Sequence, residues 1–177
     1  MKHEDTLTRH HRLLHAINEL PKRMLSVYSR DNSPEFVLHH LCNTTCFDVP
    51  KAAYFVDNPD FDCTKGVAGF AREEHAHTNF NHWDKPEDFT QHMRVSPFNA
   101  QVRSVLTPSI YRSQKPDNVV ISDIAGNLGM RDYAYCSWNM KHDNRGFLVY
   151  EVNGQCDDLF NELFADSAHF LGFCPIH

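Results

Sequence analysis

The first part of the chain carries apolar residues at helical spacing. They recur at heptad-like intervals as Leu7, Leu14, Ile17, Met24 and Tyr28. This period predicts an amphipathic helix over residues 7–28. Pro21 lies inside the segment, and its ring and missing N–H favour a kink or a break at that point.

A second helix is predicted to begin at Ser33. Ser33 has the residue type of an N-cap, and Pro34 suits the first turn of a helix. The carboxylate of Glu35 favours the positive end of the helix dipole. We expect this helix to end near Cys46.

Short apolar segments then predict two β-hairpins. Residues 51–56 and 63–71 form the first, around turn-forming residues at 57–60, and residues 133–140 and 146–152 form the second. Between the hairpins, the pattern predicts a polar loop or lid at 72–86 and short helices at 86–93 and 96–106. A buried strand at 119–122 and a turn at 125–129 follow. After the second hairpin, a final amphipathic helix is predicted from Asp157.

The order of these elements predicts an α+β fold, with a central antiparallel sheet flanked by N- and C-terminal helices. Its 177 residues fit one domain. We divide the chain into an amphipathic helix at residues 1–32 and a ligand-binding domain at residues 33–177. The helix before Pro21 carries more apolar surface than one helix needs to cover a sheet. This surplus favours a homodimer formed through the helix. The alternative is a monomer whose first helix packs back on its own sheet.

Composition narrows the range of partners. The net charge is −6 and the Lys and Arg residues are scattered, which argues against binding to nucleic acid. No apolar run approaches the roughly 18 residues of a membrane span. The polar N-terminus lacks the apolar core of a secretory signal, so we expect a cytoplasmic protein with its six cysteines reduced.

Thirteen histidines are the unusual feature of the composition, and they are densest at His75, His77 and His82. Imidazole is a common ligand of Zn and Fe, and residues i and i+2 of a strand face the same way. These three side chains are therefore a candidate metal site. Glu73 and Glu74 beside them fit the alternative of a solvated surface loop equally well.

Two thiols, Cys42 and Cys46, are spaced one helical turn apart. They form either a redox-responsive pair or two structural thiols, with Cys42 in the core and Cys46 near the end of the helix. No second pair of closely spaced cysteines follows, as a zinc or iron–sulfur site would require. The chain also lacks a Gly-x-Ser-x-Gly elbow, a phosphate-binding loop and a His-Glu-x-x-His motif. These absences favour a binding protein over an enzyme.

Three segments together resemble a known family. They are a helix followed by a strand that ends in an acid (36–57), the stretch 110–124, and a closing hairpin with its helix (133–173). Their order resembles that of GAF domains, whose layout PAS domains share, over residues 33–173. The resemblance implies a sensor that binds cyclic nucleotides, chromophores, haem or metabolites and signals through its terminal helices.

The chain departs from the ligand motifs of that family. It has no Asn-Lys-Phe-Asp-type motif of the members that bind cyclic nucleotides. No cysteine stands in the setting that attaches a bilin. Gly66 and Gly69 enclose no cysteine, unlike the Gly-rich loops of members that reduce methionine sulfoxide.

An apolar pocket with a few aimed polar groups is predicted on one side of the sheet. Its candidate residues are Phe70, Trp83, Asp123, Arg131, Tyr133, Tyr135 and Trp138. Arg131 or Arg112 would bind an anionic ligand through bidentate hydrogen bonds from its guanidinium group. Tyr133 and Tyr135 share a face of their strand, whereas Trp138 has the spacing of the opposite face. The alternative is that the aromatic residues only fill the core.

These observations predict a small-molecule-binding sensor or signalling-accessory domain of GAF-like type. One alternative is a small metal-dependent or thiol redox protein that uses the His75/His77/His82 loop or the Cys42/Cys46 pair. A second alternative is an interaction adaptor without a ligand. The ligand itself is not predicted.

Overall fold

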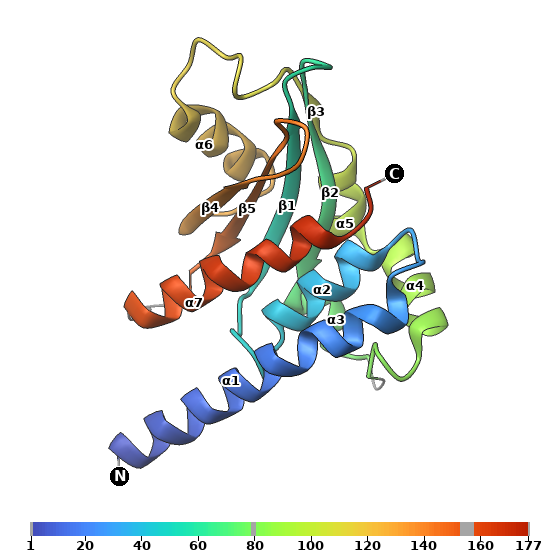
Figure 1. The fold of residues 1–177 in the computed structure, drawn as a ribbon, viewed down its shortest axis with the longest axis vertical. Helices are drawn as coiled ribbons and strands as arrows, with labels where there is room; N and C mark the ends of the chain where they lie inside the picture. The colour runs from blue at the N-terminus through green and yellow to red at the C-terminus, as the bar shows by residue number, and fades with distance from the viewer. Residues whose placement is uncertain (1, 79–80, 153–157, 177) are drawn as a thin grey trace.

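An antiparallel sheet forms the middle layer of the molecule (Figure 1). The computed structural model describes residues 2–78, 81–152 and 158–176, and within these the sheet has five strands in the order β3-β2-β1-β5-β4. The strands are β1 (Lys51–Asn58), β2 (Cys63–Ala71), β3 (Leu106–Thr107), β4 (Tyr133–Asn139) and β5 (Arg145–Glu151). Both predicted hairpins are confirmed, and pairing of β1 with β5 joins them.

Helices cover both faces of this sheet (Figure 1). They are α1 (Lys2–Val27), α2 (Ser33–Cys42), α3 (Arg72–His75), α4 (Pro86–Val95), α5 (Pro97–Arg103), α6 (Asp117–Asn127) and α7 (Asp158–Ala168), followed by the 3-10 turn η1 (His169–Phe173). Helices α1, α2 and α7 share one hydrophobic core with the sheet, and α5 and α6 share the other. The predicted α+β arrangement is therefore confirmed.

The central strand β1 is buried on both of its faces, which explains why its sequence is a continuous apolar run. Its side chains alternate between the two cores. Tyr54 enters the first core and stacks on Trp138 with ring centroids 5.7 Å apart. Phe55 enters the second core and stacks on Phe147 at 4.9 Å.

Helix α1 continues through Pro21, so a break at that position is wrong. Leu20 and Val27 lie on either side of Pro21 and are both fully buried, so packing holds the helix together across the proline. Leu7 and Leu14 on the same helix stay exposed, and dimerisation through α1 remains a prediction. The first turns of α1 project beyond the rest of the molecule (Figure 1), whereas Leu13 already packs in the first core.

Helix α2 ends at Cys42, earlier than the predicted end near Cys46. The cause is the side chain of Asn43, whose amide oxygen accepts hydrogen bonds from the backbone N–H of Thr45 at 3.0 Å and from the Thr45 hydroxyl at 3.2 Å. An Asn that bonds the backbone two residues on favours a turn over another helical turn.

The strand predicted at 119–122 is wrong, because these residues belong to helix α6. Ile121, Ile124 and Ala125 are its buried residues, at the spacing of one helix face. Gly129, with φ 68°, then ends the helix in a Schellman arrangement: its N–H donates to the carbonyl of Gly126, and the N–H of the next residue donates to Ala125. The predicted turn at 125–129 is therefore largely the last turn and cap of α6.

The helices of the described ranges include none with both the length and the apolar character that a membrane crossing requires.

Strand β2 approaches helix α5 so closely that only glycine fits at position 66 of the strand. A Cβ atom at Gly66 would collide with the backbone carbonyl oxygen of Val102 and lie 2.7 Å from its carbonyl carbon. Because backbone cannot move aside as a flexible side chain does, Gly66→Ala is expected to destabilise the fold by about 3 kcal/mol. Urea unfolding measures this loss.

Gly126→Ala is the matched control for that experiment. Gly126 lies in helix α6, and a Cβ atom there would meet nothing within 4 Å. Since alanine favours the helix over glycine, the control is expected to stabilise the protein by about 0.5–1 kcal/mol. Equal unfolding midpoints for wild type and Gly66→Ala would contradict the required close approach.

Candidate functional site

A pocket of about 510 Å³ lies beside the sheet where helix α2, the end of β2 and the segment after it meet. Its walls contain four histidines together with Phe70 and Trp83. The histidines are His39 and His40 from α2, His75 from α3, and His82 from the loop before α4. We call this cavity the histidine pocket. Its volume suits a small-molecule ligand.

Local structure explains how these histidines meet. His39 lies on the buried face of α2, and α3 begins directly after β2, which places His75 over Phe70. The rings of His75 and Phe70 stack with centroids 5.1 Å apart and an angle of 5° between their planes. The turn that carries His82 is held by Asn81, whose side-chain oxygen accepts from the N–H of Trp83 at 2.9 Å.

The imidazole rings pack directly against one another. The ring centroid of His39 lies 4.3 Å from that of His82 and 4.6 Å from that of His75. His92 of α4 follows on, with its ring centroid 4.6 Å from that of His75. The two contacts of His39 bring together residues separated by more than 30 positions in the sequence.

His40 has a different role from its neighbours, because both of its ring nitrogens are engaged. Its Nε2 lies 2.9 Å from the backbone carbonyl oxygen of Ala16 in α1, and its Nδ1 accepts from the indole N–H of Trp83 at 3.1 Å. A carbonyl oxygen only accepts, so the proton of His40 is on Nε2. His40 therefore ties the pocket wall to helix α1.

Burial keeps the pocket histidines neutral near pH 7. Burial, followed by the neighbouring His82 and His75, holds the pKa of His39 well below its ordinary value. Burial lowers the pKa of His75 to about 4 and that of His82 to about 3. A neutral imidazole keeps one nitrogen lone pair available to a ligand.

Three of these rings carry a buried nitrogen without a hydrogen-bond partner in the described part of the chain. The atoms are Nδ1 of His39, Nε2 of His75 and Nε2 of His82. Buried polar atoms are normally paired, so these three nitrogens are positions at which water or a ligand in the cavity would supply the missing partner. His39 and His82 are only 8% and 6% exposed.

The predicted metal set of His75, His77 and His82 is not brought together. His75 and His82 line the pocket, but His77 is exposed and lies outside it. Among the residues that the structure describes, no group of three or more His, Cys, Asp or Glu side chains could hold a metal ion. His39, which the sequence did not single out, lies where His77 was expected. The sequence does offer one indication of this position: His39 follows the core residue Phe36 by three residues, so both lie on the same face of the helix.

The residues predicted to bind a ligand separate into two groups. Phe70 and Trp83 line the histidine pocket. The others lie elsewhere: Asp123, Arg131 and Tyr135 are exposed, Tyr133 packs against the second core, and Trp138 is buried in the first. Tyr133 and Trp138 do occupy opposite faces of β4, as their spacing predicts.

A larger cleft of about 590 Å³ lies between the turn after α1 and helices α4 and α5, but two of its arginines, Arg30 and Arg103, are already paired with carboxylates. Arg103 donates to the buried carboxylate of Glu35 at 2.9 Å, and Asn99 donates to the same oxygen at 2.8 Å. Arg30 donates to Glu87 at 2.6 Å. The smaller histidine pocket is therefore the better candidate, since it has unpaired buried atoms.

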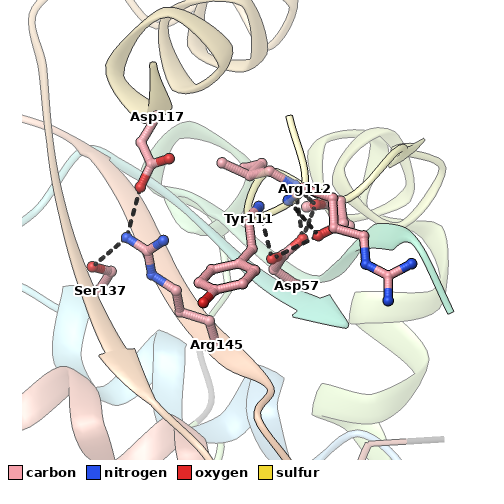
Figure 2. Close-up of polar contacts among 9 residues, drawn as sticks. Asp57, Tyr111, Arg112, Asp117, Ser137 and Arg145 are labelled. Atoms are coloured by element: carbon pink, nitrogen blue, oxygen red, sulfur yellow. Dashed lines mark hydrogen bonds and ion pairs between the residues drawn. The ribbon is translucent and has the colours of Figure 1, made fainter. Parts of the chain in front are cut away.

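A second polar cluster is structural (Figure 2). The carboxylate of Asp57, 1% exposed at the end of β1, accepts four hydrogen bonds. The donors and distances are the Thr64 hydroxyl at 2.6 Å, the Ile110 N–H at 2.9 Å, the Ser109 hydroxyl at 3.1 Å and the Tyr111 N–H at 3.2 Å. These bonds fasten the 109–111 loop to the sheet.

Beside this cluster, Arg145 donates to Asp117 at 2.8 Å and to Ser137 at 3.4 Å (Figure 2). The cavity between Asp57 and Arg145 measures about 10 Å³. That is about the space of one water molecule, so this cluster leaves no room for a ligand. Arg112, one of the two predicted anion-binding arginines, is exposed nearby and lines none of the cavities described above.

The two thiols fit the core interpretation. Cys42 and Cys46 are buried and not joined by a disulfide. Burial raises the pKa of Cys42 well above its ordinary value and that of Cys46 to about 12. Both are protonated near pH 7 and are weak nucleophiles.

Comparison with known proteins adds no relative. No family model matches the chain, and neither a curated protein nor a solved structure matches it. The histidine pocket is therefore interpreted from its own geometry.

Proposed function

We propose that this chain is a small-molecule-binding domain whose ligand occupies the histidine pocket. The observation that carries the proposal is the set of three buried, unpaired imidazole nitrogens around a cavity of about 510 Å³. Phe70 and Trp83 supply apolar walls and Arg23 adds positive charge, whereas the guanidinium of Arg72 is paired with the carboxylate of Asp48 at 2.7 Å. Apolar walls with a few aimed polar groups are typical of ligand sites.

A sensor of GAF-like type is the proposed biological role. The pocket wall connects to helix α1 through the His40–Ala16 hydrogen bond and through Arg23, whose guanidinium lies 6.0 Å from the ring centroid of Trp83. A ligand that moves Trp83 would therefore change contacts of α1. That route supports passage of a signal through a terminal helix, as the resemblance implies.

Retention of a small molecule tests the proposed function. We expect native mass spectrometry of freshly purified protein to show a non-covalent adduct of small-molecule size. His82→Ala removes one pocket nitrogen and is expected to weaken binding about fivefold, since one hydrogen bond contributes about 1 kcal/mol. His77→Ala, at an exposed position outside the pocket, is the control and is expected to change nothing.

Fluorescence provides the second measurement. The chain has two tryptophans. Trp138→Phe leaves Trp83 in the pocket wall as the reporter, while Trp83→Phe leaves Trp138 in the first core. Adding the retained molecule back is expected to change the emission of the first variant and not the second. The opposite pattern, or an adduct held equally by His82→Ala and wild type, would reject the histidine pocket as the site.

A further inference from the structure

We propose that the histidine pocket binds a small organic anion of the carboxylate class, held by Arg23 and by a pocket histidine that takes up a proton. This inference rests on the proposed function, because it names the chemistry of the ligand for the same site. The sequence predicted an anion-binding arginine at Arg131 or Arg112, and both lie outside this pocket. Arg23 of helix α1, which lines the pocket, takes that role.

The lining of the histidine pocket contains no carboxylate among the residues that the structure describes. The chain as a whole has 23 acidic residues and a net charge of −6, so this wall differs from the average surface. Its titratable and charged side chains are Arg23, His39, His40, Cys42, Arg72, His75 and His82. None of these groups is negatively charged near pH 7. A bound carboxylate therefore meets no like charge on the pocket wall.

Arg23 carries a positive charge that a ligand can use. Its side chain is half-buried, and its guanidinium lies 6.0 Å from the ring centroid of Trp83. Glu19, one turn earlier on α1, is paired with Lys22 at 3.0 Å. In the described part of the chain, the ion pairs include none with Arg23. A guanidinium binds a carboxylate through two parallel N–H groups.

Arg72 gives a second reason for a ligand that accepts hydrogen bonds. One of its terminal nitrogens is paired with Asp48 at 2.7 Å, but its Nε is buried and has no partner within the described ranges. Arginine N–H groups only donate, so this atom requires an acceptor. A carboxylate has two acceptor oxygens and no donor. It can satisfy such a group, whereas an ammonium ion cannot.

His75 is the pocket histidine best placed to take up a proton from solvent when the anion binds. It is half-buried, whereas His39 and His82 are only 8% and 6% exposed. Burial and the neighbouring His92 lower its pKa to about 4, so it is neutral near pH 7 without a ligand. An opposite charge in contact raises the pKa of a histidine by roughly 1–3 pH units. The unpaired Nε2 of His75 then becomes a charged donor to the carboxylate.

The acids closest to the pocket are already engaged. The titratable and charged groups in and beside it are Arg23 of α1, His39, His40 and Cys42 of α2, Asp48 before β1, Arg72, Glu74 and His75 of α3, His82 of the next loop and His92 of α4. Asp48 pairs with Arg72, and Glu74 accepts from the Ser96 hydroxyl and from the N–H of Phe98 at 2.8 Å. A protonated His75 would therefore pair with the carboxylate of the ligand.

The apolar walls favour an organic anion over an inorganic one. Phe70 and Trp83 offer aromatic surface to the body of a ligand, and the volume of about 510 Å³ suits a molecule larger than a simple ion. An aromatic carboxylate combines the two features, so benzoate is a suitable probe.

Three probes of similar size test the charge of the ligand on the full-length protein. They are benzoate, neutral benzamide and cationic benzylammonium, followed by nuclear magnetic resonance of the two indole N–H groups. The Trp83 indole donates to His40 in the pocket wall, and Trp138 in the first core is the internal control. We expect benzoate to shift the Trp83 signal with a Kd of about 1 mM or lower, about tenfold tighter than benzamide. Benzylammonium is expected not to bind.

The outcomes separate this inference from the proposed function. Benzamide that binds at Trp83 as tightly as benzoate would overturn the anion inference and leave the proposed function standing, since the pocket still takes a small molecule. Benzoate that shifts only Trp138, or neither indole, would also overturn the inference. The adduct retained in native mass spectrometry then decides the proposed function alone.

A pair of variants on helix α1 assigns the charge to Arg23. Arg23→Gln is expected to weaken benzoate binding about tenfold and to leave benzamide binding within about twofold, because it removes a charge-assisted hydrogen bond. Retained benzamide binding also shows that the variant pocket is intact. Lys22→Gln, at the adjacent exposed position outside the pocket, is the control. Equal losses of benzoate affinity in both variants would reject Arg23 as the anion-binding group.

Proton uptake is tested by lowering the pH from 8 to 6, a range in which benzoate stays ionised. The Kd for benzoate is expected to fall about threefold or more, because the anion favours the protonated histidine, while the Kd for benzamide stays constant. His75→Phe keeps a ring against Phe70 and is expected to remove the pH dependence, whereas the exposed control His77→Gln retains it. A benzoate Kd that is the same at pH 8 and pH 6 in wild type would overturn the uptake of a proton.

Discussion

The protein is expected to lose about 6 kcal/mol of its unfolding free energy between pH 7 and pH 5. The pKa of His75 is lowered to about 4 and that of His82 to about 3, and the pKa of His39 is also well below its ordinary value. In the unfolded chain these groups titrate near pH 6.5. The unfolded state therefore binds more protons below that pH, and stability falls as the pH falls.

The size of the effect follows from the unfolded state. Each histidine that stays neutral in the folded protein costs about 2 kcal/mol between pH 7 and pH 5, and His39, His75 and His82 are three such residues. Burial also lowers the pKa of His40, which acts in the same direction. Domains of this size are stable by about 5–15 kcal/mol, so acid alone is expected to bring the protein close to unfolding. Urea unfolding in EDTA at pH 7 and pH 5, followed by circular dichroism, measures the difference.

A matched pair of variants assigns this pH dependence to the pocket. His82→Phe keeps an aromatic ring among Phe36, Trp83 and Phe89 but cannot take up a proton, so it should reduce the loss by about 2 kcal/mol. His77→Gln, at an exposed position, should leave the loss unchanged. A free energy of unfolding that is the same at pH 7 and pH 5 would contradict neutral histidines in the folded core.

Much of the fold was predictable because its signals are local. The hairpin strands follow from short apolar runs bounded by turn residues, and both are present. The start of helix α5 was visible in Ser96 and the proline that follows it. In the structure the Ser96 hydroxyl accepts the N–H of Asn99 at 3.2 Å, as an N-cap does.

Helix α6 shows where local signals mislead. Val119, Val120 and Ile121 are β-branched and resemble a buried strand, yet the buried positions continue to Ile124 with helical spacing. Gly129 was the available signal, since glycine often ends a helix in the left-handed conformation. This error also affects the resemblance to GAF domains, because the stretch 110–124 was one of the three segments that carried it.

The histidine pocket was predictable only in part. His75 and His82 stand out because they are dense in sequence, whereas His39 lies more than 30 residues earlier and reaches them only through the packing of α2 against β2. Which ring nitrogens lack a partner depends on that packing as well. The contrast between His39 and His40 illustrates the point, since neighbours in sequence have different roles in the structure.

Asp57→Ala is expected to destabilise the protein by about 4 kcal/mol. The substitution removes the acceptor of four hydrogen bonds at a carboxylate that is 1% exposed. The hydroxyls of Thr64 and Ser109 can turn toward other acceptors, but the N–H groups of Ile110 and Tyr111 are fixed by the backbone. The Ile110 N–H retains only the Thr64 hydroxyl oxygen, at 3.3 Å, as a second acceptor. Each unpaired buried donor costs about 1–3 kcal/mol.

Because Asp57 contacts the 109–111 loop, Asp57→Ala should also loosen this loop in the folded protein, in addition to lowering the free energy of unfolding. Asp57 accepts three hydrogen bonds from the 109–111 loop (Figure 2), whereas Asp62 and Thr64 accept one each from its Ser109 and Ile110 N–H groups. Hydrogen exchange of the Ile110 and Tyr111 amides should therefore accelerate more than exchange in the core of β1. Asp60→Ala, at an exposed position, is the control and should stay within about 0.5 kcal/mol of wild type. Asp57→Asn retains one oxygen but turns an amide N–H₂ toward fixed donors, so it should lose about 2 kcal/mol. An Asp57→Ala protein within about 1 kcal/mol of wild type would show that water replaces the carboxylate and that the loop is held by other contacts.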